Sequence, residues 1–153
     1  MSFQEKLLGD IKAAMKARDQ LRLDTLRMVK AKIQEKEVEL RGKKGREHVL
    51  EDGEILQVLT TAAKQRRDSI ESFRSGGREE LAAKEEQELA IIQEFLPKQL
   101  SDEDLERLVK EAVEETGAAS PKDMGKVMKA VMPKVKGQAD GKRINAAVRK
   151  LLT

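Results

Sequence analysis

The chain has 153 residues, of which 39% are hydrophobic and 39% charged, and it contains no Cys, Trp or Tyr. Without cysteine there is no disulfide, no thiolate nucleophile and no Cys-ligated zinc. Ala, Leu, Glu, Lys and Arg dominate over the residues that favour strands, so the composition predicts an all-α fold without a sheet. No apolar run reaches the length of a signal peptide or a transmembrane helix, and we therefore expect a soluble cytoplasmic protein with no membrane partner.

Positive charge is concentrated in the last quarter of the sequence. Residues 1–97 contain 19 basic and 19 acidic groups, residues 98–116 contain three and seven, and residues 117–153 contain nine and two. The terminal segment therefore has a net charge of +7, although the whole chain has only +3. Such a field attracts polyanions, which makes a nucleic acid or an acidic protein surface a candidate partner.

Capping and spacing signals predict the first two helices. Ser2 and Glu5 form a capping-box pattern, and apolar residues then recur every four positions before a stop near Arg18. A longer helix is predicted over 19–41, where apolar residues follow near-heptad spacing and Gly42 supplies the stop.

Two further helices complete the N-terminal part. The Gly-containing, charged segment that follows predicts a loop, and Asp52 is the expected N-cap of a third helix, which a Gly-Gly pair ends. A fourth helix closes at Pro97. We expect helices two and three to pack as a long antiparallel hairpin, with the first helix folded back along it. Residues 1–97 would then form an N-terminal domain of about four helices.

Residues 98–153 predict a C-terminal domain that is a small three-helix bundle. Each of its helices has apolar residues at helical spacing, which supply the inner face. Polar caps, a glycine stop and prolines at a helix start and a helix end delimit the helices. In chain order these signals are Ser101, Gly117, Ser120 with Pro121, Pro133 and Asp140.

The sequence offers no set of residues suited to catalysis. The single histidine, His48, lies in the charged loop without a partner pattern, so we expect an ordinary exposed loop residue. The glutamates at 79–80 and 85–88 lie on helices rich in Arg and Lys, where surface ion pairing is expected rather than metal binding. No Gly-rich phosphate-binding motif is present. We therefore expect no catalytic residue, no metal and no cofactor.

The candidate site is the basic side of the C-terminal domain. On its second helix, lysines recur at helical spacing opposite the apolar face, and further basic groups lie on the following turn and on the last helix. Gly137, Asp140 and Gly141 are expected to shape that turn. The alternative interpretation is that these groups only keep a small bundle soluble. The candidate nucleic-acid-binding residues are Lys126, Lys129, Lys134, Lys136, Lys142, Arg143, Arg149 and Lys150.

Two features limit how this surface could bind a nucleic acid. It contains no aromatic residue, so bases cannot stack on it and binding must be to backbone and shape. The free N–H groups at the start of the last helix, at Gly141, could hold a phosphate. A capping carboxylate of Asp140 would already occupy those donors, which weakens that idea.

Three stretches of the sequence resemble a known family. They are KQRRDSIESFRSGGREEL at 64–81, EFLPKQLSDEDL at 94–105 and MGKVMKAVMPKVKGQADGKRINAAVRKLL at 124–152. Together they resemble the YqeY family over essentially the whole chain. The last block also resembles the tail domain of the GatB subunit of the glutamine-dependent aspartyl/glutamyl-tRNA amidotransferase, a domain that contacts and positions the tRNA. The resemblance thus implies an all-helical fold and tRNA binding, through Lys126, Lys129, Lys136, Lys142 and Arg143.

The resemblance also brings the label of a carbon-nitrogen ligase with glutamine as amido-N-donor. This chain lacks the kinase-like and amidase parts that such chemistry requires, so we interpret the label as association rather than activity. The favoured hypothesis is a tRNA-binding or tRNA-linked accessory protein with no catalytic site of its own. The alternative is a helical protein-protein interaction adaptor, which would dock a protein partner on the N-terminal hairpin.

Overall fold

The computed structural model of the chain describes residues 2–153. These residues form seven α-helices and two short 3₁₀ helices and contain no strand, which confirms the all-α prediction. The α-helices are α1 (Phe3–Ala17), α2 (Gln20–Lys44), α3 (Asp52–Ser75), α4 (Glu79–Gln93), α5 (Asp102–Thr116), α6 (Met124–Val131) and α7 (Gly141–Leu152), and the 3₁₀ helices are η1 (Pro121–Asp123) and η2 (Met132–Lys134).

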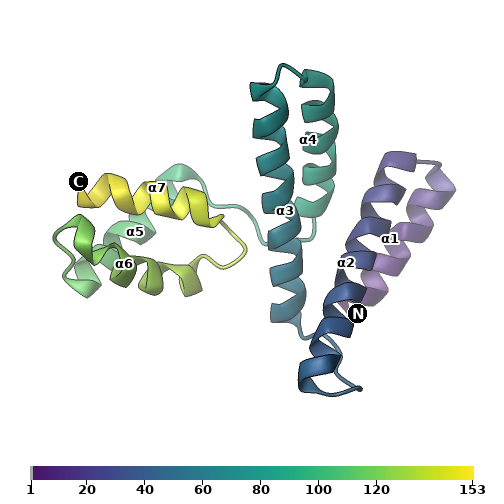
Figure 1. The fold of residues 1–153 in the computed structure, drawn as a ribbon, viewed down its shortest axis with the longest axis horizontal. Helices are drawn as coiled ribbons and strands as arrows, with labels where there is room; N and C mark the ends of the chain where they lie inside the picture. The colour runs from purple at the N-terminus through teal and green to yellow at the C-terminus, as the bar shows by residue number, and fades with distance from the viewer. Residues whose placement is uncertain (1) are drawn as a thin grey trace. The chain divides into compact units, whose positions relative to one another are not determined.

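The chain divides into two compact units, Met1–Leu96 and Pro97–Thr153. The first contains α1 to α4 and the second contains α5 to α7 (Figure 1). Each unit has a hydrophobic core of its own. All the candidate basic residues belong to the second unit, so their positions depend on how α5, α6 and α7 pack.

Two helix pairs build the first unit. α1 packs on α2, and α4 lies along α3 (Figure 1). The contact of α3 with α4 is more extensive than its contact with any other helix. The expected long hairpin of α2 and α3 is not confirmed, because the chain turns back at Gly77, in the left-handed region with φ of 72°, and lays α4 along α3 instead. α2 also contacts α4, and Leu26 and Ile92 are fully buried in the shared core.

Ion pairs link α3 to its partner helix α4. Arg66 Nε lies 2.9 Å from Glu88 Oε2 and 3.3 Å from Glu85 Oε2. Further along the pair, Arg74 Nη2 lies 2.6 Å from Glu86 Oε1. The sequence prediction that these glutamates form ion pairs is therefore confirmed. Helices α2 and α3 share a smaller contact.

Two helix ends in the first unit differ from the prediction. α2 continues through Gly42 to Lys44, because glycine costs a helix only about 1 kcal/mol, and Gly45 with φ of 114° ends it. The N-cap of α3 is Glu51 rather than Asp52. Its backbone N–H donates to Glu54 Oε1 at 2.9 Å, which forms a capping box that satisfies an otherwise free donor.

The second unit consists of α5, α6 and α7, and each of these helices packs on the other two. The predicted caps at both ends of α5 and at the start of α7 are confirmed: Ser101 Oγ accepts the Asp104 N–H at 3.2 Å, and Gly117 has φ of 69°. Asp140 Oδ1 accepts the Arg143 N–H at 2.8 Å. The largest fully buried side chains of this unit are Leu105, Val109, Val127, Val131, Val135, Ile144 and Val148.

α6 is bounded by prolines, as predicted, but the side-chain cap expected at its start is not formed. Pro121 opens the 3₁₀ turn η1 instead of the α-helix itself, and Ser120 makes no capping hydrogen bond within residues 2–153. The carboxylate of Asp123 instead accepts the N–H of Ala119, upstream of the helix, at 3.0 Å. At the other end α6 stops at Val131, because Pro133 has no N–H to continue the ladder.

Candidate nucleic-acid interface

α6 presents two lysines to solvent because its apolar residues fix which side is inside. Val127 and Val131 are completely buried, at 0% exposure each. Lys126 and Lys129 are therefore directed outward, and both are exposed. Neither ammonium group has an ion-pair or hydrogen-bond partner among residues 2–153.

The turn after α6 separates two lysines with different surroundings. Val135 is fully buried between them and anchors the turn in the core. Lys134 Nζ contacts Glu115 Oε2 on α5 at 3.0 Å, whereas Lys136 is exposed and unpaired in the described part of the chain. Gly137 is buried with φ of 77°, a backbone region that favours glycine, so it does shape the turn.

The same turn is held by the segment that leads into α5. Leu100 N–H donates to the Gln138 carbonyl at 2.8 Å, and Gln99 Nε2 donates to the Gly137 carbonyl at 2.8 Å. Arg143 Nη2 donates to the Leu100 carbonyl at 2.7 Å and pairs with Asp102 at 2.9 Å. The Arg143 side chain therefore ties this segment to α7.

α7 places its remaining cations in different surroundings. Lys150 Nζ pairs with Glu106 Oε1 on α5 at 2.9 Å, and this hydrogen bond raises the pKa of Lys150 above its ordinary value. Arg149 is exposed and its guanidinium has no partner within residues 2–153. Lys142 is exposed in the first turn of α7.

Acidic residues of α5 explain why only part of the predicted site has free charge. Three of the eight candidate residues form ion pairs with this helix, and two of them line a shallow groove between α5 and α7 together with their carboxylates. Sequence reasoning counted the acidic residues of 98–116 but did not pair them with individual cations. We call the four candidates without a side-chain partner the unpaired cations: Lys126, Lys129, Lys136 and Arg149.

The N-terminus of α7 is already capped, so it is not a free phosphate site. Asp140 is 8% exposed, and its carboxylate accepts the Arg143 N–H. Gly141 follows as the first residue of α7, and nothing lies within 4 Å of the position that a Cβ would take there. Of the two glycines predicted to shape the turn, only Gly137 has a backbone conformation that favours glycine.

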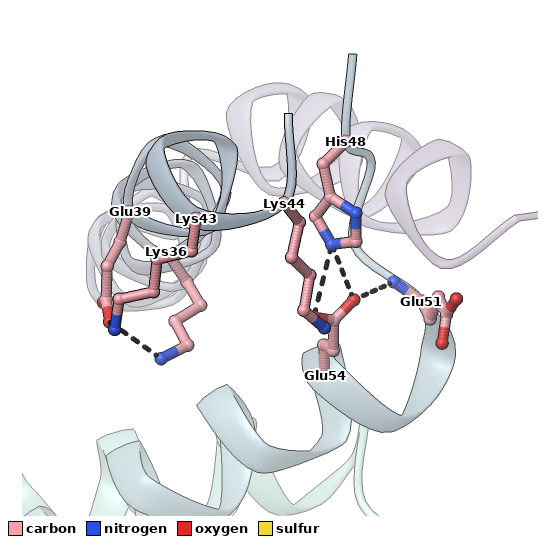
Figure 2. Close-up of polar contacts among 7 residues, drawn as sticks. All are labelled: Lys36, Glu39, Lys43, Lys44, His48, Glu51 and Glu54. Atoms are coloured by element: carbon pink, nitrogen blue, oxygen red, sulfur yellow. Dashed lines mark hydrogen bonds and ion pairs between the residues drawn. The ribbon is translucent and has the colours of Figure 1, made fainter. Parts of the chain in front are cut away.

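The prediction that His48 is an exposed loop residue is wrong. Its side chain is only 15% exposed, and its Nε2 lies 3.0 Å from Glu54 Oε1 (Figure 2). Lys44 Nζ reaches the other oxygen of the same carboxylate at 3.2 Å. The hydrogen bond from the Glu51 N–H, aided by Lys44 and His48, lowers the pKa of Glu54 to about 2. The sequence signal was the capping-box spacing of the two glutamates, which places Glu54 at the end of this loop.

Residues 2–153 contain neither a metal-binding cluster nor a membrane-spanning helix. No group of three or more His, Asp or Glu side chains is placed there to hold a metal ion. None of the described helices combines the length and the apolar character needed to cross a bilayer.

Fold and surface together define an all-helical protein with a basic C-terminal unit. The chain belongs to the YqeY family, whose sequence profile, described as Yqey-like protein, matches residues 4–152. The match covers both units, so the family assignment applies to the whole of the fold described above.

Several curated relatives are fungal proteins with one shared name, Altered inheritance of mitochondria protein 41, mitochondrial. The Vanderwaltozyma polyspora protein is 32% identical over 132 residues, which are 80% of this chain and 68% of that protein. The Pyrenophora tritici-repentis protein is 30% identical over 139 residues, or 88% of this chain and 71% of that protein. The Saccharomyces cerevisiae protein is 36% identical over 90 residues, which are 59% of this chain and only 46% of that protein.

These names contradict the expectation of a cytoplasmic location. The relatives are named as mitochondrial proteins, whereas the expectation rested on the absence of a secretory or membrane-spanning apolar run. That absence does not bear on mitochondria, since mitochondrial targeting segments are amphipathic and basic rather than continuously apolar.

Proposed function

We propose that this protein binds tRNA, or acts beside a tRNA-dependent enzyme, through the unpaired cations of its second unit. The observation that carries the proposal is that four basic side chains of one small unit are exposed and have no carboxylate partner within residues 2–153, in a segment with a net charge of +7. When an unpaired ammonium or guanidinium group neutralises a phosphate, a counterion condensed on the nucleic acid is released, which favours binding at low salt. Because residues 124–152 resemble the amidotransferase tail domain, which contacts tRNA, we propose that the polyanion is tRNA.

The composition of the second unit favours contacts to the phosphate backbone. All three phenylalanines lie in residues 1–96, and the chain has no Tyr or Trp, so the second unit has no ring on which a base could stack. Contacts from lysine and arginine to phosphates carry no direct information about the base sequence of the RNA. The protein should therefore bind different tRNAs with similar affinity.

The test is a binding titration with unfractionated tRNA, followed by fluorescence anisotropy. In the test variant Lys126, Lys129, Lys136 and Arg149 are all replaced by Gln. Gln keeps a good helix propensity and removes only the charge. We expect the loss of four phosphate contacts, which reduces the salt slope of log K by roughly 3.

A matched control separates the site from the total charge. It removes four exposed cations of the first unit, Lys12, Lys16, Arg27 and Arg46, which have no side-chain partner in the described residues. Both variants have the same net charge, so a purely global field predicts equal losses of affinity. The proposal predicts a large loss for the second-unit variant and a small one for the control. Equal losses, or no binding by the unmodified protein, would refute it.

One observation on α1 favours a second candidate function, a protein-interaction adaptor. Leu8 is 44% exposed and Met15 is 52% exposed, and they lie seven positions apart, two turns along one side of the helix. Exposed apolar side chains on one helix face can receive a partner helix. A pull-down with nuclease treatment tests this candidate: a partner that stays bound after digestion and is lost on replacing both residues with Ser supports it.

A further inference from the structure

A groove lies between α2 and α3, where sequence analysis predicted a closely packed hairpin. Its volume is about 270 Å³. The α2 wall carries four charged residues of alternating sign, Lys32, Glu35, Lys36 and Glu39. Lys32 lies three and four residues before Glu35 and Lys36, and Glu39 lies four and three residues after them, so all four lie on one face of the helix.

The opposite wall on α3 differs in chemistry, because it carries no charge. Gln57 and Gln65 are exposed along its rim, and Ala62 is buried at its floor. A side-chain amide donates and accepts hydrogen bonds, so it can satisfy either a lysine or a glutamate. The groove is thus suited to a helix that presents charges of both signs.

The stripe on α2 is complementary to itself when it is reversed. If a second α2 lies antiparallel against the first, Lys32 of one copy faces Glu39 of the other, and Glu35 faces Lys36. All four residues then meet an opposite charge, and the two-fold axis repeats each pair. A parallel arrangement would instead place each charge beside its own copy and would be repulsive.

We infer that the α2–α3 groove is the contact surface between two copies of this chain, joined by an antiparallel α2 pair. Within one copy the same residues form only exposed contacts one turn apart: Lys32 Nζ is 3.4 Å from Glu35, and Lys36 Nζ is 3.3 Å from Glu39. Figure 2 shows Lys36 and Lys43 reaching the Glu39 carboxylate. An ammonium group has three N–H donors, so these lysines can keep their contacts and add one across the interface.

The test uses two variants that distinguish the dimer from the intrahelical pairs. Glu35→Lys places like charges opposite each other at two points of the dimer. Adding Lys36→Glu restores opposite charges across the two-fold axis, because residues 35 and 36 exchange signs. Within a single helix both variants have two like and two opposite charge pairs three or four residues apart, so intrahelical pairing predicts no difference between them. Recovery in the double variant is therefore expected of the dimer and not of the intrahelical pairs.

Sedimentation velocity at about 50 mM salt, over a range of protein concentrations, measures the association. We expect a concentration-dependent dimer of the 17.2 kDa chain, a roughly tenfold weaker association for Glu35→Lys, and recovery in the double variant. Circular dichroism confirms that both variants are helical. A protein that remains a monomer at all concentrations overturns the inference. So does a Glu35→Lys variant that dimerises normally, or a double variant weaker than the single one.

Discussion

Glu85 lies in a site that holds more negative charge than it can pair. Arg66 is 18% exposed and has two carboxylates around its Nε, those of Glu85 and Glu88, which are 23% and 17% exposed. Glu88 makes the hydrogen bond at 2.9 Å, whereas Glu85 Oε2 is buried and has no hydrogen-bond partner in the described part of the chain. Burial, and then the charge of Glu88, raise the pKa of Glu85. Replacing this carboxylate with a neutral amide should therefore stabilise the protein.

The size of the effect follows from the hydrogen bond that the amide can make. The Gln NH₂ can donate to the Glu88 carboxylate, which an ionised Glu85 can only repel, and a hydrogen bond contributes about 0.5–1.5 kcal/mol. We expect Glu85→Gln to gain about 1 kcal/mol at pH 7, which raises the melting temperature by about 2–4 °C in a chain of this length. The control is Glu88→Gln, which removes the hydrogen-bonded partner of Arg66 and should lose about 1–2 kcal/mol.

The pH dependence gives this prediction a second test. Because folding raises the pKa of Glu85, the folded chain holds the proton more tightly than the unfolded chain, and ionisation costs stability as pH rises through that pKa. The gain from Glu85→Gln should therefore be present at pH 7 and shrink toward pH 4, as thermal unfolding followed by circular dichroism would measure. A gain that is equal at both pH values, or a loss at pH 7, refutes the reasoning.

Three further predictions concern single contacts, each measured by thermal unfolding. Gly137→Ala should cost about 1–2 kcal/mol of stability, because φ at this position is 77°. Gly141→Ala, in open space at the start of α7, should change the stability little. Equal effects of the two substitutions would contradict this prediction. Asp140→Ala should cost about 1 kcal/mol through loss of the α7 cap, and Asp140→Ser should recover most of it. Glu54→Gln should destabilise the protein at pH 7. Because folding lowers the pKa of Glu54, the difference in stability between the variant and the unmodified protein should vanish as pH falls from about 4.5 to about 2. A difference that stays constant with pH would argue against the capping box.

Local signals in the sequence predicted the helix ends of the second unit well. Ser101, Gly117 and Asp140 act within four residues of their own position, so the sequence contains all the information that these caps need. Pro133 acts locally for the same reason. The all-α class followed from composition, which does not depend on how the helices pair.

The pairing of helices could not be read from the sequence. α2 carries charge on several sides, and its apolar residues contact both α1 and α4. Its hydrophobic pattern therefore does not indicate a single partner helix. The α3–α4 pair depends on Arg66 meeting residues about 20 positions away, which periodicity does not encode. His48 was misjudged for the same reason, since Glu54 reaches it only when the loop closes.

The candidate site was predicted as a set of residues but not as a pattern of free charge. Lysines at helical spacing show which side of α6 is exposed, because the apolar residues fix the buried side. Which cations are neutralised depends on α5, whose carboxylates reach Lys134, Arg143 and Lys150 from a different part of the chain. That information is tertiary and appears only when the three helices pack together.

The salt dependence of tRNA binding by the unmodified protein tests the central claim most directly. Four phosphate contacts, at about 0.7–0.9 each, give a slope of log K against log salt near −3, and a loss of affinity of roughly 50- to 150-fold between about 50 and about 200 mM salt. We expect the unmodified protein to give that slope. A slope near zero, or no detectable binding at about 50 mM salt, would contradict the claim that the second unit binds the phosphate backbone of tRNA.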